Sequence, residues 1–420
     1  MRSVQLGFNR KVARRQAPLG GHSRPKPWSI GLVALLVAAG SAVALVAAEM
    51  RTAPSQRPVG AAAAVGNDLF RRAASHCHLA SAADRRHGQS SLMIGLHVSL
   101  RLFVGRGRCE EARLAQETGI QAVREDISWA LTEPQPSRYQ WANDDSVVRT
   151  ATQAGLTLLP VLDDAPPWAA PTSTSLPSDP SAYAAFVAAV VARYGRGGSF
   201  WRSNPHLRAR PLVWYELWNE PYDAASNRDP AVYAQLVQAA VTAGRAANPA
   251  ARFLMEGATD YQTTSGTHAP WLSAMYAAVP DLGRYFDGLA VHPYGGNPAI
   301  YRPQGNTDNQ PGRVEQMHDE LAAHADGNKP LWVTEIGWST CTGTNGCVTE
   351  GQQAAYLRTF LTLARTTWRS YVRAVFVYEL RDLASNRRDD REAWYGLLRP
   401  DLSRMPAWQV LHDAAGGGAP

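Results

Sequence analysis

Two glutamates, each at the end of a short apolar segment, could carry chemistry in this chain of 420 residues. Glu220 lies in the segment 214–221, which reads Trp-Tyr-Glu-Leu-Trp-Asn-Glu-Pro, and Glu335 lies in 331–338, which reads Leu-Trp-Val-Thr-Glu-Ile-Gly-Trp. Both follow β-prone residues, and helix-like sequence follows each after a loop. Two carboxyl groups that face each other across a cleft are what hydrolysis of a glycosidic bond requires. The two segments together are therefore much more specific than a single Asn-Glu-Pro.

The two glutamates belong to a regular alternation of strand-like and helix-like segments. The strand-like segments are residues 92–97, 120–126, 156–162, 212–218, 252–256, 286–291, 331–335 and 372–379. The helices expected after them are residues 109–118, 144–154, 181–194, 230–247, 268–278, 313–325, 352–369 and 406–414. Continuous apolar strands that alternate with amphipathic helices indicate a parallel sheet covered by helices. Eight such units predict an α/β protein with a (β/α)8 TIM barrel, a fold whose chemistry lies at the carboxyl ends of the strands.

The N-terminal region predicts that the barrel is exported. Residues 1–27 hold seven Lys and Arg and no acidic residue, and residues 28–48 form an uncharged apolar run. Such a run can span the hydrocarbon core, and its positive flank stays in the cytoplasm. The run exceeds the 7 to 15 apolar residues of a signal peptide, which favours a retained transmembrane anchor over a cleaved signal segment. Residues 49–90 are expected to form a flexible tether and residues 91–415 the barrel domain, outside the cytoplasm.

The charge balance disfavours a nucleic-acid partner. The net charge of the chain is +6, but seven of its 42 Lys and Arg lie in residues 1–27, which leaves −1 for the rest (+6 − 7). No basic patch remains that would suit nucleic acid. We therefore expect a polysaccharide or oligosaccharide as the partner, together with a membrane contact through the N-terminal segment.

The four cysteines agree with an exported protein that contains disulfides. Cys341 and Cys347 bracket a Gly-containing pentapeptide directly after the second glutamate segment, which predicts a bridge between them. Cys77 and Cys109 remain as the other expected pair, although four cysteines permit three connectivities. Zinc binding is disfavoured because no Cys-x-x-Cys occurs, so no metal or other cofactor is expected.

The positions of the glutamates make the chain resemble a large clan of retaining (β/α)8 glycoside hydrolases. Asn219-Glu220 falls at the fourth predicted strand and Glu335 at the seventh, where that clan has its acid/base and its nucleophile. Residues 123–129 and 378–382 look most like family 39, and the cellulase-like family 5 is the near rival. The resemblance implies double displacement, with Glu335 as nucleophile and Glu220 as acid/base. It also implies carboxyl groups about 5 to 5.5 Å apart.

The resemblance assigns roles to the side chains around this pair. Asn219 matches the residue that holds the sugar 2-hydroxyl. Arg124, His292 and Tyr294 match residues that orient the nucleophile and the sugar, and a nearby arginine favours an ionised carboxylate. Other interpretations remain, because Arg124 could form an ion pair at the rim and His292 could be a hydrogen-bonded core residue.

Further side chains at strand ends are also expected near the substrate. Trp129 and Trp338 follow strands, where aromatic rings can stack on sugars, although Trp also fills space between barrel and loops. Glu379, at the end of the last strand, is expected to reach the substrate. Glu216 and Glu256 are interpreted as buried residues behind the site.

Two other functions would use the same residues. A transglycosylase that remodels surface glycan would differ only in its acceptor. A non-catalytic carbohydrate-binding barrel is disfavoured because both glutamates are present, whereas a barrel without activity commonly lacks one of them.

Overall fold

The eight predicted strands are all present and close into a parallel barrel. The structure is a computed structural model that describes residues 79, 92–223, 229–263, 268–300, 310–343, 346–383 and 387–417. The barrel strands are β1 (Met93–His97), β2 (Ala122–Ser128), β3 (Thr157–Asp163), β4 (Trp214–Leu217), β5 (Arg252–Gly257), β8 (Gly288–Val291), β9 (Leu331–Ile336) and β10 (Val372–Val377). Their order around the barrel is β1-β10-β9-β8-β5-β4-β3-β2.

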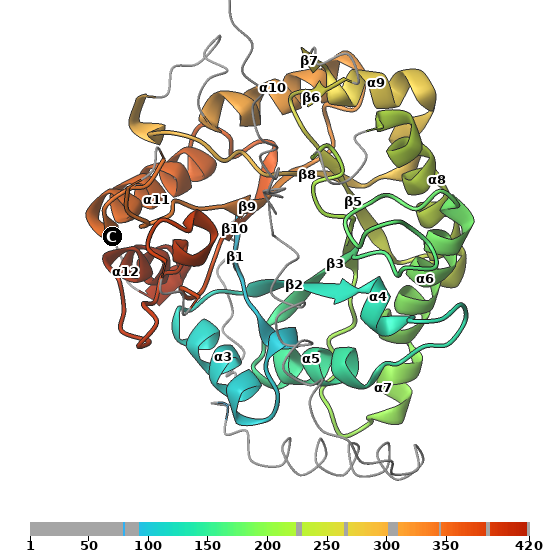
Figure 1. Ribbon diagram of the computed structural model, residues 1–420, viewed down its shortest axis with the longest axis horizontal. Helices are drawn as coiled ribbons and strands as arrows, with labels where there is room; N and C mark the ends of the chain where they lie inside the picture. Colours follow the sequence, from blue (N-terminus) through green and yellow to red (C-terminus); the bar gives the residue numbers. More distant parts are fainter. Residues whose placement is uncertain are drawn as a thin grey trace, which may run out of the picture. The chain divides into compact units, whose positions relative to one another are not determined.

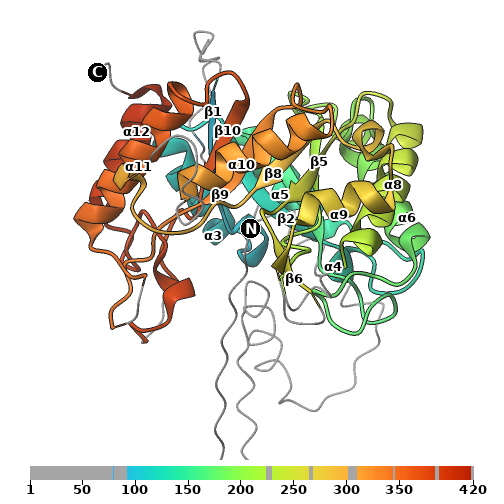
Figure 2. The ribbon, with the colours of Figure 1, turned by 90° about the horizontal axis from the view of Figure 1, so that it is seen from above.

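Helices surround this barrel (Figure 1). They are α3 (Arg106–Glu117), α4 (Trp129–Thr132), α5 (Ala142–Gln153), α6 (Pro180–Tyr194), α7 (Ser199–Ser203), α8 (Pro230–Ala247), α9 (Trp271–Ala278), α10 (Gln310–Ala323), α11 (Glu350–Arg365) and α12 (Pro406–His412). In Figure 2, α11 and α12 lie on one side of the strands and α6 and α8 on the other. The predicted strands and helices match these bounds to within four residues, while α4, α7 and the hairpin of β6 (Tyr261–Gln262) and β7 (His268–Ala269) were not expected.

Helix starts follow local sequence rules. The Asp179 carboxylate accepts a hydrogen bond from the Ser181 amide at the start of α6, and Asp229 does the same for the Ala231 amide of α8. A proline follows each of these aspartates at the first helical position, where no amide hydrogen is needed. Thr349 begins α11 with a capping box.

The barrel interior has an apolar layer, with a polar layer nearer the carboxyl ends of the strands. The buried apolar residues are Ala122, Leu159, Leu254, Ala290, Trp332, Ala374 and Phe376. Gly95 of β1 leaves room for one of them, because a Cβ atom there would lie 2.3 Å from the Phe376 ring. Side chains alternate along a strand, so the residue two positions after an inward-facing one also faces inward. On four of these strands, that residue lies in the layer nearer the carboxyl ends. These four are the polar residues Arg124, Glu256, His292 and Thr334.

β9 contains a β-bulge beside Glu335. From Val333 to Ile336 the strand advances three residues while its partner β10 advances two. In a regular strand Thr334 and Glu335 would point to opposite faces, but a bulge re-aims a side chain. Both residues therefore contact the polar layer, Thr334 through His292 and Glu335 through Arg124.

The predicted bridge between Cys341 and Cys347 is confirmed, with Cα atoms 5.1 Å apart. It closes a short loop after β9. Cys109, in α3, is also disulfide-bonded, and its expected partner Cys77 lies outside the described residues.

The predicted leader, apolar segment and tether, residues 1–90, lie outside the described part of the chain apart from Leu79. Within the described part, no helix is both long and apolar enough to cross a membrane.

Candidate active site

The two glutamates singled out from the sequence lie side by side at the carboxyl ends of β4 and β9. Glu220 follows β4 in a short loop, and Glu335 is brought inward by the bulge in β9. A carboxylate oxygen of each lies within 4.8 Å of the other and of a ring nitrogen of His292. Residues 115 positions apart thus form one compact group.

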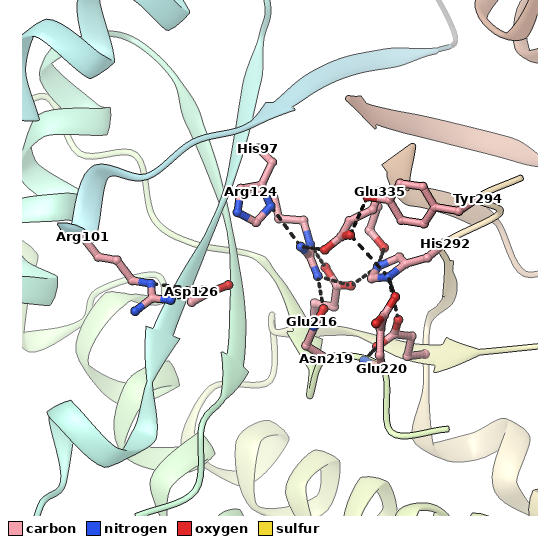
Figure 3. Close-up of polar contacts among 12 residues, drawn as sticks. His97, Arg101, Arg124, Asp126, Glu216, Asn219, Glu220, His292, Tyr294 and Glu335 are labelled. Carbon is pink, nitrogen blue, oxygen red and sulfur yellow. Dashed lines mark hydrogen bonds and ion pairs between the residues drawn. The ribbon is translucent and has the colours of Figure 1, made fainter. Parts of the chain in front are cut away.

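Arg124, at the centre of this group, is buried, and its guanidinium group contacts two carboxylates and the Asn219 side chain (Figure 3). Its Nη1 atom donates to Glu335 Oε1 at 2.5 Å, and its Nε atom donates to Glu216 Oε2 at 2.8 Å. Its Nη2 atom donates to Asn219 Oδ1 at 2.9 Å. One guanidinium group therefore fixes Glu335 and the loop that carries Asn219.

Two residues from the end of β8 contact the glutamates from the other side. The Tyr294 hydroxyl donates to Glu335 Oε2 at 2.8 Å. His292 Nδ1 lies 3.0 Å from Glu220 Oε1 and 3.2 Å from Glu256 Oε1. Burial lowers the pKa of His292, but the surrounding carboxylates, first among them Glu256 and Glu335, outweigh it and raise that pKa well above its ordinary value. His292 therefore carries a positive charge among these acids.

The carboxyl groups in the site are driven to different protonation states. Burial disfavours the charge of Glu335, but the cations His292 and Arg124 outweigh it and lower the pKa of this carboxyl. Against the same penalty of burial, Arg124 lowers the pKa of Glu216 to about 2. Burial raises the pKa of Glu256 to about 8. At neutral pH, Glu335 and Glu216 are therefore anions, and Arg124 and His292 are the cations that face them.

Two tryptophans expected to stack on sugar do not offer a free ring. Trp129 begins α4 and is fully buried, with its indole N–H donating to Glu133 and its ring stacked on Phe186. Trp338 is 4% exposed and donates to the Gly296 carbonyl. Both predictions are wrong, because these rings fill space between the barrel and its surroundings.

Glu379 lies two residues beyond β10, and its contact with the substrate stays a prediction. Its backbone N–H donates to the Tyr395 carbonyl at 3.3 Å, and its carbonyl accepts from the Leu397 N–H at 3.1 Å. Glu379 is 5% exposed, and burial together with the charge of Glu111 on α3 raises its pKa well above the ordinary value.

Tyr378, the residue before Glu379, stands among the aromatic rings beside Glu335. Its ring lies 6.4 Å from that of Tyr294 and 5.4 Å from that of Tyr395, edge to face in both pairs. The inward alternation along β10 could have identified Tyr378 from the sequence. Tyr395 comes from a loop after β10 and has no comparable signal.

His97, at the end of β1, completes the contacts of Arg124. Its Nδ1 atom lies 3.2 Å from Arg124 Nη1. Burial and the neighbouring guanidinium lower the pKa of His97 to about 4, so this imidazole is neutral and can accept a hydrogen bond. His97 has no signal in the sequence beyond its place at the end of the first predicted strand.

Two triads in the site have the atom types that could ligate a metal. They are Glu216, Glu256 and His292, and Glu220, His292 and Glu335. Since His292 is protonated in both triads, a metal would have to displace that proton. The absence of a metal therefore stays a prediction.

The fold and the site define the class of this protein as a (β/α)8 glycoside hydrolase. The chain belongs to the cellulase family, glycosyl hydrolase family 5, whose family model matches residues 109–372. The barrel is thus a glycoside hydrolase domain, and the resemblance to the clan is confirmed. None of the curated proteins matches the chain.

Solved structures of similar fold come from several families of the clan. A family 39 glycoside hydrolase from the gut symbiont Bacteroides cellulosilyticus WH2 is 23% identical, with a TM-score of 0.58 and coverage of 78% of this chain and 64% of that one. A monomeric β-xylosidase from Caulobacter crescentus CB15 is 18% identical, with a TM-score of 0.52 and coverage of 76% and 67%. A family 5 protein from Bifidobacterium longum is 13% identical, with a TM-score of 0.52 and coverage of 78% of both chains. At these identities the likeness concerns the fold.

Proposed function

We propose that this glycosidase cleaves O-glycosidic bonds of a polysaccharide or oligosaccharide with retention of configuration. The Glu335 carboxylate attacks the anomeric carbon while Glu220 gives its proton to the leaving oxygen. Glu220 then takes a proton from water, the water oxygen bonds to the anomeric carbon, and Glu335 is released. Two successive inversions restore the starting configuration.

The closeness of the two carboxylates is the observation that carries this proposal. Oxygen atoms of Glu220 and Glu335 lie within 4.8 Å of each other. In retaining enzymes the carboxyl groups are about 5 to 5.5 Å apart, whereas inverting enzymes keep about 6.5 to 9.5 Å to admit a water molecule. The observed spacing supports direct attack by one carboxylate.

The surroundings of each glutamate support the assignment of roles. A nucleophile must be ionised, and His292 and Arg124 lower the pKa of Glu335 despite its burial. An acid/base must exchange protons with water, and the Glu220 side chain is 32% exposed. Because Asn219 accepts from Arg124 through Oδ1, its amide N–H groups remain to donate to a sugar hydroxyl.

A screen of aryl glycosides and polysaccharides first identifies a substrate. The kinetics of the native enzyme, Glu335→Ala and Glu220→Ala on that substrate then test the mechanism. Glu335→Ala should abolish turnover. The turnover rate of Glu220→Ala should fall by roughly 10²- to 10⁴-fold on substrates whose leaving group needs a proton. The rate should fall less on substrates with an activated leaving group, and azide should restore part of it. Proton NMR of the first product formed by the native enzyme should show the retained anomer. An inverted product, or variants as active as the native enzyme, would refute the proposal.

We also propose that the enzyme acts on glycan outside the cytoplasm, held by residues 28–48 as a membrane anchor. The Cys341–Cys347 disulfide supports an oxidising compartment. The similar structure from Bifidobacterium longum contains Manβ1-4GlcNAc, which supports an oligosaccharide as the kind of ligand.

Intact mass of the native protein tests the anchor, since a mature N-terminus near Glu49 would mean cleavage and secretion. Product analysis with an added oligosaccharide acceptor would reveal any glycosyl transfer.

A further inference from the structure

Glu256 is a fully buried carboxyl group that contacts the acid/base, although the mechanism above does not use it. It lies on β5 in the polar layer. Its Oε2 atom accepts the backbone N–H of Glu220 at 2.6 Å, and its Oε1 atom accepts the Tyr222 hydroxyl at 3.2 Å. The same Oε1 atom is 3.2 Å from His292 Nδ1, which is 3.0 Å from the Glu220 carboxylate. Glu256 thus contacts the backbone of Glu220 and the imidazole next to its side chain.

The backbone around the acid/base needs support from outside its own loop. Trp218 has a φ angle of 69° and Glu220 has one of 45°, in the left-handed region that is unfavourable for residues with a Cβ atom. Such conformations persist only where the surroundings impose them. The Trp218 N–H is held by the Leu162 carbonyl at 3.1 Å, and the Glu220 N–H is held by Glu256.

Glu256 is itself fixed by its neighbours. Its backbone N–H donates to the Tyr233 hydroxyl of α8 at 2.9 Å. That hydroxyl donates to the Leu217 carbonyl, the last residue of β4, at 2.6 Å. A helix therefore ties together the ends of β4 and β5 from which Glu220 and Glu256 extend, and a site on such rigid elements is held accurately.

We propose that Glu256 is a positioning residue for the acid/base. Its contacts with the Glu220 N–H and with His292 set the place of the Glu220 carboxyl relative to the leaving oxygen. The inference rests on the proposed function, because it takes Glu220 as the proton donor. Proton transfer needs the donor within about 2.6 to 3.2 Å of the acceptor, so a displaced Glu220 slows the steps that require a proton much more than the others.

Two variants of Glu256 and one control separate positioning from general stability. Glu256→Ala removes both contacts, whereas Glu256→Gln keeps an oxygen that can accept the Glu220 N–H. Glu111→Gln is the matched control, since Glu111 is another buried carboxyl, 2% exposed, on α3 outside the barrel interior. All proteins are assayed on two glycosides of the same sugar, one with a dinitrophenolate leaving group and one with an alcohol leaving group. kcat/KM is compared because it reports the first covalent step.

Glu256→Ala should lower kcat/KM for the alcohol leaving group by about 10- to 100-fold, part of what a general acid contributes, and much less for dinitrophenolate. Glu256→Gln should recover most of this loss, and Glu111→Gln should behave as the native enzyme. Equal losses on both substrates with a lowered Tm, or no loss on either, would overturn the inference. If Glu220→Ala itself showed no dependence on the leaving group, the proposed function would fail instead.

Discussion

Arg124→Gln should make the nucleophile gain a proton at a higher pH than in the native enzyme. Arg124 Nη1 contacts Glu335 Oε1 at 2.5 Å, and the guanidinium is 1% exposed. For charges about 4 Å apart at an effective dielectric constant near 20, Coulomb's law gives about 4 kcal/mol, or about 3 pKa units. Because His292 remains as a second cation near Glu335, we expect the pKa of Glu335 to rise by about 1 to 3 units.

The acid limb of the pH–rate profile measures this pKa. Attack requires the carboxylate, so kcat/KM falls as the pH drops through the pKa of Glu335 in the free enzyme. In the native protein, His292 and Arg124 keep that pKa below its ordinary value, which places the loss of activity at low pH. In Arg124→Gln the loss should begin at a pH about 1 to 3 units higher. An aryl glycoside gives the rates, and the maximum rate is expected to fall as well.

A variant that keeps the cation provides the comparison. Removing Arg124 leaves the buried carboxylate of Glu216 without its main partner. Breaking a buried ion pair lowers the free energy of unfolding by about 3 to 5 kcal/mol, so the Tm of each variant is measured alongside the kinetics. Arg124→Lys retains a positive charge and should shift the acid limb less than Arg124→Gln. If folded Arg124→Gln had the acid limb of the native enzyme, the electrostatic account of Glu335 would be wrong.

Two other predictions concern stability. Serine at both Cys341 and Cys347 opens a loop with a sequence separation of 6, for which the chain-entropy relation gives a loss of about 2 kcal/mol and a Tm lowered by about 3 °C. Calorimetry measures this, and an unchanged Tm would show that the bridge does not stabilise the fold. Glu379 has a pKa raised by burial, so it costs stability as the pH rises above its unfolded-state pKa, about 4.5. The free energy of unfolding of Glu379→Gln, measured in urea, should therefore depend less on pH between about pH 5 and 8 than that of the native protein. An equal dependence on pH in the two proteins would contradict this.

The fold could be predicted from the sequence because each element has a strong local pattern. Strands such as 157–163 and 252–257 contain runs of consecutive apolar residues, and helices such as α6 and α8 start at an Asp-Pro pair. Eight repeats of one pattern leave few alternatives to a barrel. Elements without such a pattern, α4 and α7, were missed because they span only four and five residues.

The candidate site was predictable only in part, because several side chains are aimed by features that have no local signal. Glu335 reaches the interior through a bulge, which the alternation of residues 331–335 does not reveal. Trp129 turns away from the cleft because a helix begins at that residue. Glu256 looked like any buried strand residue, and its role follows only from its contact with a backbone amide 36 positions earlier.

The two interior layers explain how the barrel can keep so many ionisable groups near one another. The apolar layer on one side of the site excludes water, which strengthens every charge–charge contact in the polar layer. Such contacts stabilise the fold only if opposite charges are matched, because a buried unpaired charge is costly. Here the cations Arg124 and His292 face the anions Glu216 and Glu335. The pattern of charges that the fold requires is therefore also the pattern that leaves Glu335 ionised for attack.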